Sequence, residues 1–539
     1  MTQDTPSFFT LDRGTVSTAA ALIAPVDGRY RMLASAAAPA AIDPEALLED
    51  LAWRVARTDA SVAAPLDDWR DWSRLEVRTF RTPRACLIAA SAETGGLLED
   101  AVAGAGWQVT ARFYEPDPDL IAFGEACLDP TVDAIFVGGR DDVDEAERDQ
   151  ARLLWPRAGA LARWRDDVAV IACGPFIERP EGVSEDRLYS LPAPEGAAAT
   201  SESQLRGAAA QVGAHLVQGG EPTGIDGRAG LRASISSLAA LLADRVEGIE
   251  IGAAAGSRTL AQADGELRHA IVSAAALLPS ELLHDDDAAD AVLLWSTTAA
   301  DPATRLDGLR ELALHPWSEI DREGTHLRLA ALRAALERLR TGWEAGPGAG
   351  RADEDAAGVL VLSGGVFATL PAAATALAVA DGIRRPGAST ILHDHARVLA
   401  PLGALPVEGD RRRLLADLMD DCLLPIGSTL VTGALGQRGK SGGRLAITTP
   451  LGEDELLLEP GQLQLVDLPP GIVARLDIDP AEGAILGVEG QRLTLEVSGG
   501  LGGLLVDTRE IPLELPDGPE QRRAQLEAWE GPAWMGSDR

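Results

Sequence analysis

The sequence predicts a multidomain α/β protein that ends in a small all-β domain. Three features support this prediction: an opening series of β-prone runs broken by turns at Gly14 and Gly28, strands that alternate with helical patterns from Arg84 onward, and frequent apolar alternation after residue 424. Strands alternating with helices favour a parallel sheet with right-handed crossovers. A chain of 539 residues is long enough for about three or four such domains.

The first turn of the chain has a composition suited to phosphate binding. An apolar run reaches Asp12, breaks at Gly14, and continues through Thr15 and Ser17. Glycine lets backbone N–H groups approach a phosphate, the two hydroxyls can donate to its oxygens, and Asp12 can hold Mg²⁺ directly or through water. An ordinary hairpin with a polar tip is the alternative interpretation.

A helix and then an α/β region follow the opening strands. Asp43 and Pro44 are typical of a helix start, and the apolar positions after them form one stripe: Leu47, Leu48, Leu51, Ala52 and Val55. Strands are expected at 85–90, 107–111, 133–137 and 168–173, with a helix from about 142 to 164.

Glycines lie just beyond these strand ends, at Gly95-Gly96, Gly138-Gly139 and Gly174. Open parallel sheets bind ligands at the carboxyl ends of their strands, but tight strand-to-helix turns are the favoured explanation of these glycines. The layout is similar to that of a cobalamin-binding module. The DxHxxG sequence of that module is absent, and His393-Asp394-His395 has the wrong spacing to replace it.

The second half of the chain repeats the theme of the opening. A helix over 231–245 precedes a strand, a small-residue turn and a returning strand over 246–259, with Glu250 in the place of Asp12. Leu329, Leu332, Leu336 and Leu339 mark an amphipathic helix. A buried strand over 359–362 then leads into Ser363-Gly364-Gly365, where backbone can lie against a flat ring or a phosphate, or where strand and helix simply pack closely.

Two other patterns are weaker than they look. His284-Asp285-Asp286-Asp287 reads as a solvated helix entry, because consecutive acids cannot all face one ion. The run 434–441 satisfies the loose Walker A pattern, but a P-loop must open a helix and here a strand-like run follows. We therefore expect a hairpin loop.

Composition limits the partners and the compartment. The formal charge is −35 and Lys440 is the only lysine, so nucleic acid and anionic membranes are disfavoured as partners. The four cysteines contain no CxxC pair and are expected to be buried thiols in a reducing compartment. No signal peptide is visible, and 356–380 reads as a strand–turn–helix, not a membrane span. These features predict a cytoplasmic protein.

Taken in order, three of these segments resemble the nucleotide site of actin-like (ASKHA) ATPases, whose lobes are ribonuclease H-like. The opening turn resembles their first phosphate loop, 249–259 their second, and Ser363-Gly364-Gly365-Val366 their adenosine loop. The best match is the glutamate mutase L (GlmL/MutL-type) family. Its Asp-x-Gly-Ser-Thr-x-Thr pattern is similar to the run from Asp12 to Ser17, and its Ser-Ser-Ala-x-Gly-Gly-Leu stretch is similar to 90–97. Its Gly-Gly after a buried strand matches Gly138-Gly139.

The resemblance covers about residues 8–425 and implies an ATP-binding, chaperone-like accessory protein of a cobalamin-dependent mutase. It assigns ATP and Mg²⁺ as cofactors, with Asp12 and Glu250 as the catalytic acids and Asp12 also on the metal. The nucleotide-binding residues that it implies are Gly14, Thr15, Ser17, Gly252, Ser363, Gly364 and Gly365. The alternative is a catalytically inactive actin-like scaffold.

The second phosphate loop departs from the family pattern Asp-Val-Gly-Gly-Ala-Thr-Thr-Asp. Here the segment 250–257 keeps one acid, Glu250, but lacks the two threonines and the final aspartate. A phosphoryl-transfer site without those groups loses hydrogen-bond donors and a metal anchor. We therefore expect weak or absent ATPase activity.

These interpretations divide the chain into five parts. They are the N-terminal part of an actin-like lobe at 1–82, a Rossmann-like α/β region at 83–178, a linker with helices at 179–245, a second actin-like lobe at 246–424, and an all-β domain with a C-terminal helix at 425–539.

Overall fold

The computed structural model has two compact units. The first unit consists of 1–79, 224–269 and 274–539, and the second of 80–223 and 270–273. The structure describes residues 7–534 except 59–68, 80, 116–118, 177–179, 181–182, 195–203, 219–224, 254–255, 264–266, 273–285, 316–321, 346–357, 434–440, 481–483, 486–487 and 490–492.

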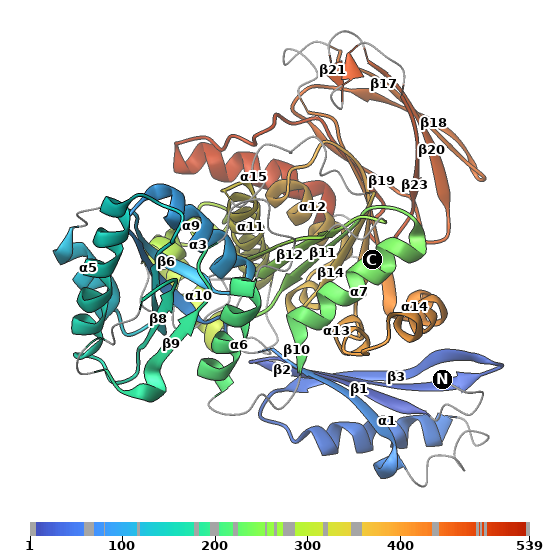
Figure 1. The fold of residues 1–539 in the computed structure, drawn as a ribbon. Coiled ribbons are helices and arrows are strands. Elements are labelled where there is room, and N and C mark those ends of the chain that lie inside the picture. The colour runs from blue at the N-terminus through green and yellow to red at the C-terminus, as the bar shows by residue number, and fades with distance from the viewer. Residues whose placement is uncertain are drawn as a thin grey trace. The chain divides into compact units, whose positions relative to one another are not determined.

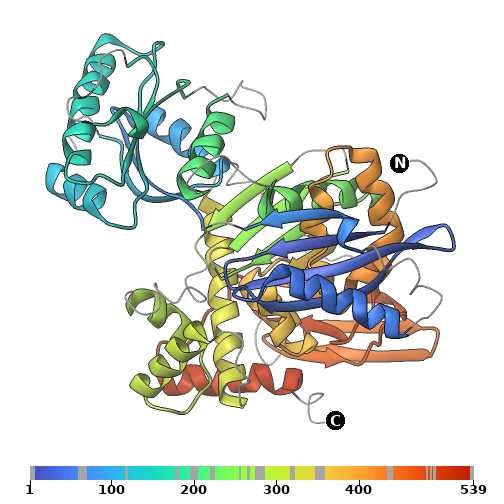
Figure 2. The same cartoon turned by 90° about the horizontal axis from the view of Figure 1, so that it is seen from below.

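The first unit begins with a five-stranded sheet in the order β10-β4-β1-β2-β3. Its strands are β1 (Phe8–Arg13), β2 (Ser17–Val26), β3 (Arg29–Pro39), β4 (Ser73–Arg78) and β10 (Ile225–Asp226). The first three are antiparallel neighbours, and β4 and β10 add parallel strands beside β1. Helix α1 (Pro44–Thr58) covers one face of this sheet (Figure 2). Its predicted apolar stripe is buried against β1 and β2.

A second, eight-stranded sheet has the order β13-β12-β11-β14-β15-β16-β24-β19. Its strands are β11 (Val246–Ile251), β12 (Gly256–Ala261), β13 (Leu267–Val272), β14 (Val359–Ser363), β15 (Gly387–Asp394), β16 (Leu423–Val431), β19 (Leu463–Val466) and β24 (Leu504–Asp507). Strand β11 pairs with β12 in antiparallel fashion on one side and with β14 in parallel fashion on the other. Strand β15 then pairs in parallel with β14.

The two sheets therefore repeat one strand order. Numbered along the chain within each lobe, the five strands lie in the order 3-2-1-4-5. The first sheet reads β3-β2-β1-β4-β10, and the matching part of the second sheet reads β13-β12-β11-β14-β15. This is the ribonuclease H-like arrangement, duplicated as in the actin-like fold, and it confirms the predicted lobes.

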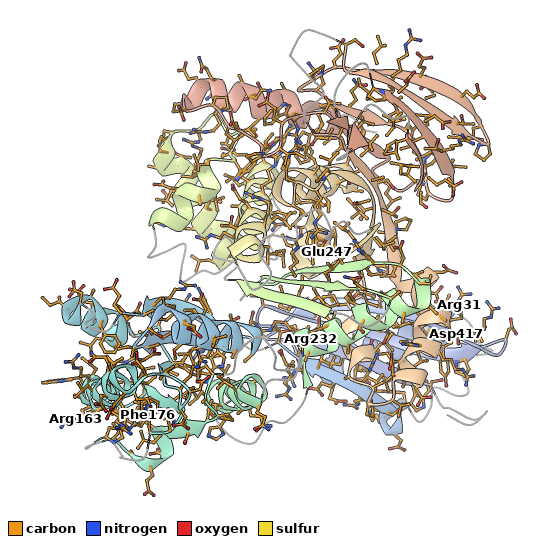
Figure 3. The ribbon with its side chains drawn as sticks, turned by 45° about the horizontal axis from the view of Figure 1, so that its top comes forward. Arg31, Arg163, Phe176, Arg232, Glu247 and Asp417 are labelled. Carbon is orange, nitrogen blue, oxygen red and sulfur yellow. The ribbon has the colours of Figure 1, made fainter. Side chains whose placement is uncertain are left out.

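Three helices fill the space between the sheets: α7 (Gly227–Leu242), α13 (Leu399–Gly403) and α14 (Glu408–Cys422) (Figure 1). Apolar side chains from both sheets and all three helices form one core. At its margin β3 meets α14, where the Tyr30 N–H donates to Asp417 at 3.2 Å and Arg31 pairs with Asp421; Arg31 and Asp417 lie close together (Figure 3).

The other face of the second sheet carries a helical layer. It comprises α9 (Asp286–Leu293), α10 (Pro302–Leu314), α11 (Arg322–Ala345), α12 (Ala372–Gly382) and the C-terminal α15 (Pro519–Trp534). The four leucines that predicted an amphipathic helix are all buried on α11. The segment from β14 to α12 is a strand, a short 3-10 turn and a helix, as the sequence predicted.

The C-terminal β region has its own four-stranded antiparallel sheet, in the order β18-β17-β20-β23. These strands are β17 (Gly443–Thr449), β18 (Gly452–Leu458), β20 (Val473–Pro480) and β23 (Leu493–Ser498). Alternate residues of β20 face the core, as expected. Residues 434–440 of the Walker-like run lie outside the described part, but Ser441 leads into strand β17. The helix that a P-loop requires is therefore not there.

The second unit is a five-stranded, all-parallel sheet in the order β6-β5-β7-β8-β9. Its elements are β5 (Arg84–Ala89), α3 (Ala92–Gly104), β6 (Gln108–Phe113), α4 (Leu120–Leu128), β7 (Ala134–Gly138), α5 (Glu145–Ala162), β8 (Ala169–Cys173), β9 (Leu188–Leu191) and α6 (Gln204–Gln218). The predicted Rossmann-like region is confirmed.

Close packing accounts for glycines at the strand ends of this sheet. Gly174 has a φ of +137°, and a Cβ there would lie 2.2 Å from the Gly139 carbonyl oxygen. A Cβ on Gly139 would lie 2.9 Å from the ring of Phe176, which itself stacks on Trp155. These contacts favour the interpretation as tight turns over a ligand-binding role.

All four cysteines are free and buried, as predicted; the sulfurs of Cys86 and Cys127 lie 3.7 Å apart. Among the helices that the structure describes, none is both long and apolar enough to cross a membrane. The acidic helix entry predicted at 284–287 lies partly outside the described residues, and α9 begins at Asp286.

A buried network of charges attaches the C-terminal helix to the second lobe. Arg333 of α11 is fully buried, and its guanidinium lies 2.7 Å from Asp381 of α12 and 2.5 Å from Glu530 of α15. Asp381 is also 2.6 Å from Arg509, which stacks on Trp529 of α15. Each buried charge thus has an opposite charge beside it, which burial requires.

We predict that Arg333→Ala lowers the free energy of unfolding by about 3–5 kcal/mol, because it leaves Asp381 and Glu530 buried beside an empty space. Urea denaturation followed by tryptophan fluorescence measures this. The matched control is Arg340→Ala on the same helix, whose partly exposed pair with Glu337 spans 3.8 Å. It should change stability by less than about 1 kcal/mol. Equal effects of the two substitutions would contradict the prediction.

Candidate functional site

Three turns of the first unit follow strand ends. Asp12 lies near the end of β1, Glu250 near the end of β11, and Ser363 is the last residue of β14. Strands β11 and β14 are parallel, with Glu250 directly opposite Ser363. Because parallel neighbours end at the same edge of a sheet, the second phosphate loop and the adenosine loop expected from the sequence lie side by side.

All three turns line a single cavity, whose volume is about 140 Å³. Every site residue predicted from the sequence contributes to its wall. They are Asp12, Gly14, Thr15, Ser17, Glu250, Gly252, Ser363, Gly364 and Gly365. Apolar side chains complete the wall on one side, including Leu309 and Leu312 of α10. Segments more than 350 residues apart in the sequence thus meet at one site.

The paired glycines of the adenosine loop have different roles. Gly364 has a φ of +108°, and a Cβ there would lie 2.2 Å from the Ile251 carbonyl oxygen. Only glycine fits this contact between the loop and the end of β11. Gly365 is more open, since a Cβ there would meet only the Ser17 hydroxyl, at 3.8 Å. Gly364 therefore serves packing, whereas Gly365 leaves space at the cavity wall.

The opening turn is a closed hairpin tip. The Gly14 N–H donates to the Ser17 carbonyl oxygen at 2.8 Å, so this amide holds the turn together and does not point at a ligand. Thr15 is exposed and borders the cavity. The turn thus combines the two interpretations of the sequence: it is a hairpin, and its polar tip faces the cavity.

Arg397, which the sequence analysis did not select, occupies the centre of the site. Its Nε lies 3.2 Å from the Asp12 carboxylate, and Nη1 donates to the Ser17 hydroxyl at 2.7 Å. Nη2 donates to the carbonyl oxygens of Asp12 and Ser17, each at 3.2 Å. The guanidinium therefore binds the whole opening turn, although Arg397 follows β15 of the other sheet.

Two carboxyl groups line the cavity together with this arginine, those of Asp12 and Glu250. Burial raises the pKa of Asp12. The positive charge of Arg397 lowers this pKa in part, and the negative charge of Asp226 raises it further. Burial also raises the pKa of Glu250 to about 7, opposed by Arg228 and by the hydrogen bond from Ser257, 3.0 Å away. Near neutral pH, Glu250 is therefore balanced between its neutral and charged forms.

Asp394, at the end of β15, fixes the position of Arg397. Its carboxylate accepts the N–H groups of Val398 and Leu399 at 2.9 and 3.2 Å and the Ser363 hydroxyl at 3.3 Å. Burial raises its pKa to about 6. Its neighbour His393 is buried with a pKa lowered to about 4, also by burial.

Sequence reasoning missed Arg397, Asp394, Asp226 and Arg228. Asp394 was noticed only as part of the His-Asp-His run. Its position at the end of a buried strand was the signal that could have marked it. Asp226 is the N-cap of α7, at the end of the first lobe. An aspartate before a helix is a recognisable sequence signal, but the glycines and proline just before Asp226 made this segment look like a linker. No pattern in the sequence marks Arg397, whose partners lie 380 or more positions away.

The donor set does not fit a Mg²⁺ ion held directly by Asp12. One oxygen of this carboxylate, Oδ2, lies 3.2 Å from Arg397 Nε. The other oxygen, Oδ1, is buried without a hydrogen-bond partner, but the guanidinium charge beside the same carboxylate repels a second cation. In the described part of the chain, no three His, Cys, Asp or Glu side chains are grouped so as to hold a metal ion. The residue expected to hold Mg²⁺ is paired with an arginine instead.

Comparison with known proteins supports no closer identification. No model of a known protein family matches the sequence, and no curated protein matches it. Among solved structures, the activator of the 2-hydroxyisocaproyl-CoA dehydratase from Clostridium difficile with bound ADPNP is 10% identical, with 74% of this chain and 92% of that chain covered and a TM-score of 0.26.

Two further structures are similar to the same degree. Component A of the (R)-2-hydroxyglutaryl-CoA dehydratase of Acidaminococcus fermentans is 8% identical, with 74% of this chain and 96% of that chain covered and a TM-score of 0.26. A carbohydrate kinase from Novosphingobium aromaticivorans is 14% identical, with 77% and 99% covered and a TM-score of 0.23. At such values the fold assignment rests on the strand order of the two sheets: the chain is a protein of the actin-like fold.

The raised pKa of Glu250 predicts a pH dependence of stability. Between pH 4.5, its ordinary pKa, and about 7, the folded chain keeps a proton that the unfolded chain releases. The contribution of Glu250 to the free energy of unfolding is therefore full below pH 4.5 and is lost as the pH rises through 7. Because glutamine stays neutral, Glu250→Gln should be more stable than the wild type by about 1–3 kcal/mol at pH 8, and equal to it at pH 4.5.

Urea denaturation at a series of pH values tests this. The matched control is Glu453→Gln, which neutralises an exposed carboxylate on β18 and should leave the profile unchanged. A wild-type stability that does not fall between pH 4.5 and 8 relative to Glu250→Gln would show that Glu250 is not desolvated.

Proposed function

We propose that this protein binds ATP in the cavity bounded by the three turns. The supporting observation is that segments at 12–17, 250–253 and 363–366, selected independently from the sequence, all line the same space. The hydroxyls of Thr15 and Ser17 and the guanidinium of Arg397 suit phosphate oxygens. The open position at Gly365 and the apolar wall from α10 suit a flat base.

The cavity volume indicates that binding involves movement of the lobes. A space of about 140 Å³ is close to that of a cavity that holds one benzene ring, so a nucleoside triphosphate needs the turns to separate. The turns at 12–17 and 250–253 belong to different sheets. A change in the distance between the sheets therefore changes the site, which is the basis of a nucleotide-driven switch.

The residues favour binding without turnover. The second phosphate loop lacks the hydroxyls and the final acid of its family pattern, and Asp12 is paired with Arg397. An acid paired in this way is a weaker base and a weaker anchor for a metal ion. We propose that opening and closing of the lobes, and not hydrolysis, carries the function.

The physiological role that we propose is that of an accessory protein to a cobalamin-dependent mutase, as the resemblance to the glutamate mutase L family suggests. The strongly acidic surface, with a net charge of −35, favours a basic or polar protein partner over nucleic acid.

An inactive scaffold is the second candidate, and the Arg397–Asp12 pair favours it. This interaction joins the two lobes through protein groups alone. A chain that uses it as a permanent link would keep the actin-like lobes as architecture and bind partners without nucleotide.

We predict that ATP binds the wild-type chain with a measurable heat, and that Gly365→Val weakens binding at least tenfold by filling the cavity wall. Isothermal titration calorimetry measures both. In the control Gly409→Val, the added side chain meets nothing within 4 Å of its Cβ, and affinity should not change. An unchanged affinity in Gly365→Val, with the wild type binding ATP, would place the nucleotide elsewhere.

Capture of a purified cobalamin-dependent mutase on the immobilised chain, with and without ATP, separates the two candidates. The accessory role predicts that ATP changes the amount of mutase retained at least threefold. Retention that is independent of ATP favours the scaffold, and no retention under either condition would remove the mutase as a partner.

A further inference from the structure

The strongest unexplained feature of the site is the conformation of Arg397. Its φ is +54°, in the left-handed region that residues other than glycine, asparagine and aspartate seldom adopt. Such a conformation persists only where the surroundings determine it. Here the Arg397 N–H donates to the Asp394 carbonyl oxygen at 3.1 Å, while the Asp394 carboxylate caps the next two residues. The backbone is thus fixed so that the guanidinium reaches the opening turn.

The contacts of the guanidinium leave it able to bind a ligand. An arginine side chain has five N–H bonds. Nη1 donates one to the Ser17 hydroxyl, Nη2 donates to two carbonyl oxygens, and Nε faces the Asp12 carboxylate. One N–H of Nη1 remains, and Arg397 lies on the cavity wall. It is therefore an oriented donor of positive charge beside the space assigned to phosphates.

The charges around the cavity favour a role for this arginine in binding an anionic ligand. Asp12 and Glu250 border the cavity, and the negative charge of Asp226 acts on both. Such a group of acids repels phosphate unless a cation lies among them. Arg397 supplies such a cation next to Asp12, and its charge repels a divalent ion from the same place.

We propose that Arg397 takes the place of a divalent metal in this site, so that the cavity binds a nucleotide polyphosphate without Mg²⁺. This inference rests on the proposed function and adds the form of the ligand. A guanidinium can pair with two phosphate oxygens through parallel N–H groups, which gives both charge and orientation. Arg328 of α11 also lines the cavity and adds a second positive group.

The experiment is calorimetric titration of ATP into the full chain, once with excess Mg²⁺ and once with EDTA. The expected result is that the two dissociation constants agree within about threefold. Binding that requires Mg²⁺ overturns the inference while leaving the proposed function intact. Absence of binding under both conditions removes the proposed function itself, and this inference with it.

Two substitutions test the residue directly. Arg397→Gln keeps a planar polar side chain without charge, and it should weaken ATP binding in EDTA at least tenfold; Arg397→Lys should lose less. Asp12→Asn should tighten binding in EDTA, because it removes a negative charge and frees the guanidinium. If Asp12 held a metal instead, this substitution would weaken binding in Mg²⁺. That result, or an unchanged affinity in Arg397→Gln, would overturn the proposal.

A control for folding keeps the test decisive. Circular dichroism and thermal denaturation show whether each variant retains the fold. The comparison of Mg²⁺ with EDTA on the wild-type chain requires no substitution, so it tests the proposal even if Arg397→Gln is unfolded.

Discussion

The attachment of Arg397 to the opening turn is the interaction on which the site depends. The residue follows the last strand of the second lobe's ribonuclease H-like core, and the four contacts of its guanidinium are all with Asp12 and Ser17 of the first sheet. It therefore sets the distance between the two sheets at the point where the cavity opens. The same contacts neutralise Asp12 and orient the Ser17 hydroxyl, so one side chain determines the geometry and the charge of the site together.

Buried arginine–carboxylate pairs recur in this chain because arginine supplies nearly all of its positive charge. With one lysine in the chain, arginine is the main cation available for burial. The planar guanidinium can contact two carboxylates at once, as Arg333 does with Asp381 and Glu530. Arginine–carboxylate pairs therefore serve two purposes in this chain. At the C-terminal helix they stabilise the structure, and at the cavity the Arg397–Asp12 pair shapes a binding site.

Much of the fold was predictable from the sequence because its signals are local. The stripe on α1, the four leucines of α11 and the alternation in β20 each identify one buried face, and the structure confirms all three. Likewise, the order of the three turns pointed to the actin-like lobes, and the duplicated strand order confirms them. The association with a mutase was not tested by the fold and remains a proposal.

What the sequence did not reveal are interactions between distant segments. The pairing of Arg397 with Asp12 joins positions 385 apart, and no spacing rule marks such a pair. The same holds for the contact of Gly364 with Ile251. The two residues meet because β11 and β14 are parallel neighbours in a particular register, and the sequence does not show that register. Sequence patterns thus located the turns that form the site, whereas the cation at its centre became visible only once the two sheets were placed together.

The most direct test of the central claim is hydrogen–deuterium exchange of the full chain with and without ATP. The account predicts slower exchange in peptides covering 12–18, 249–253, 362–369 and 394–399 when ATP is present. Unchanged exchange in these four segments, with protection elsewhere or nowhere, would contradict it.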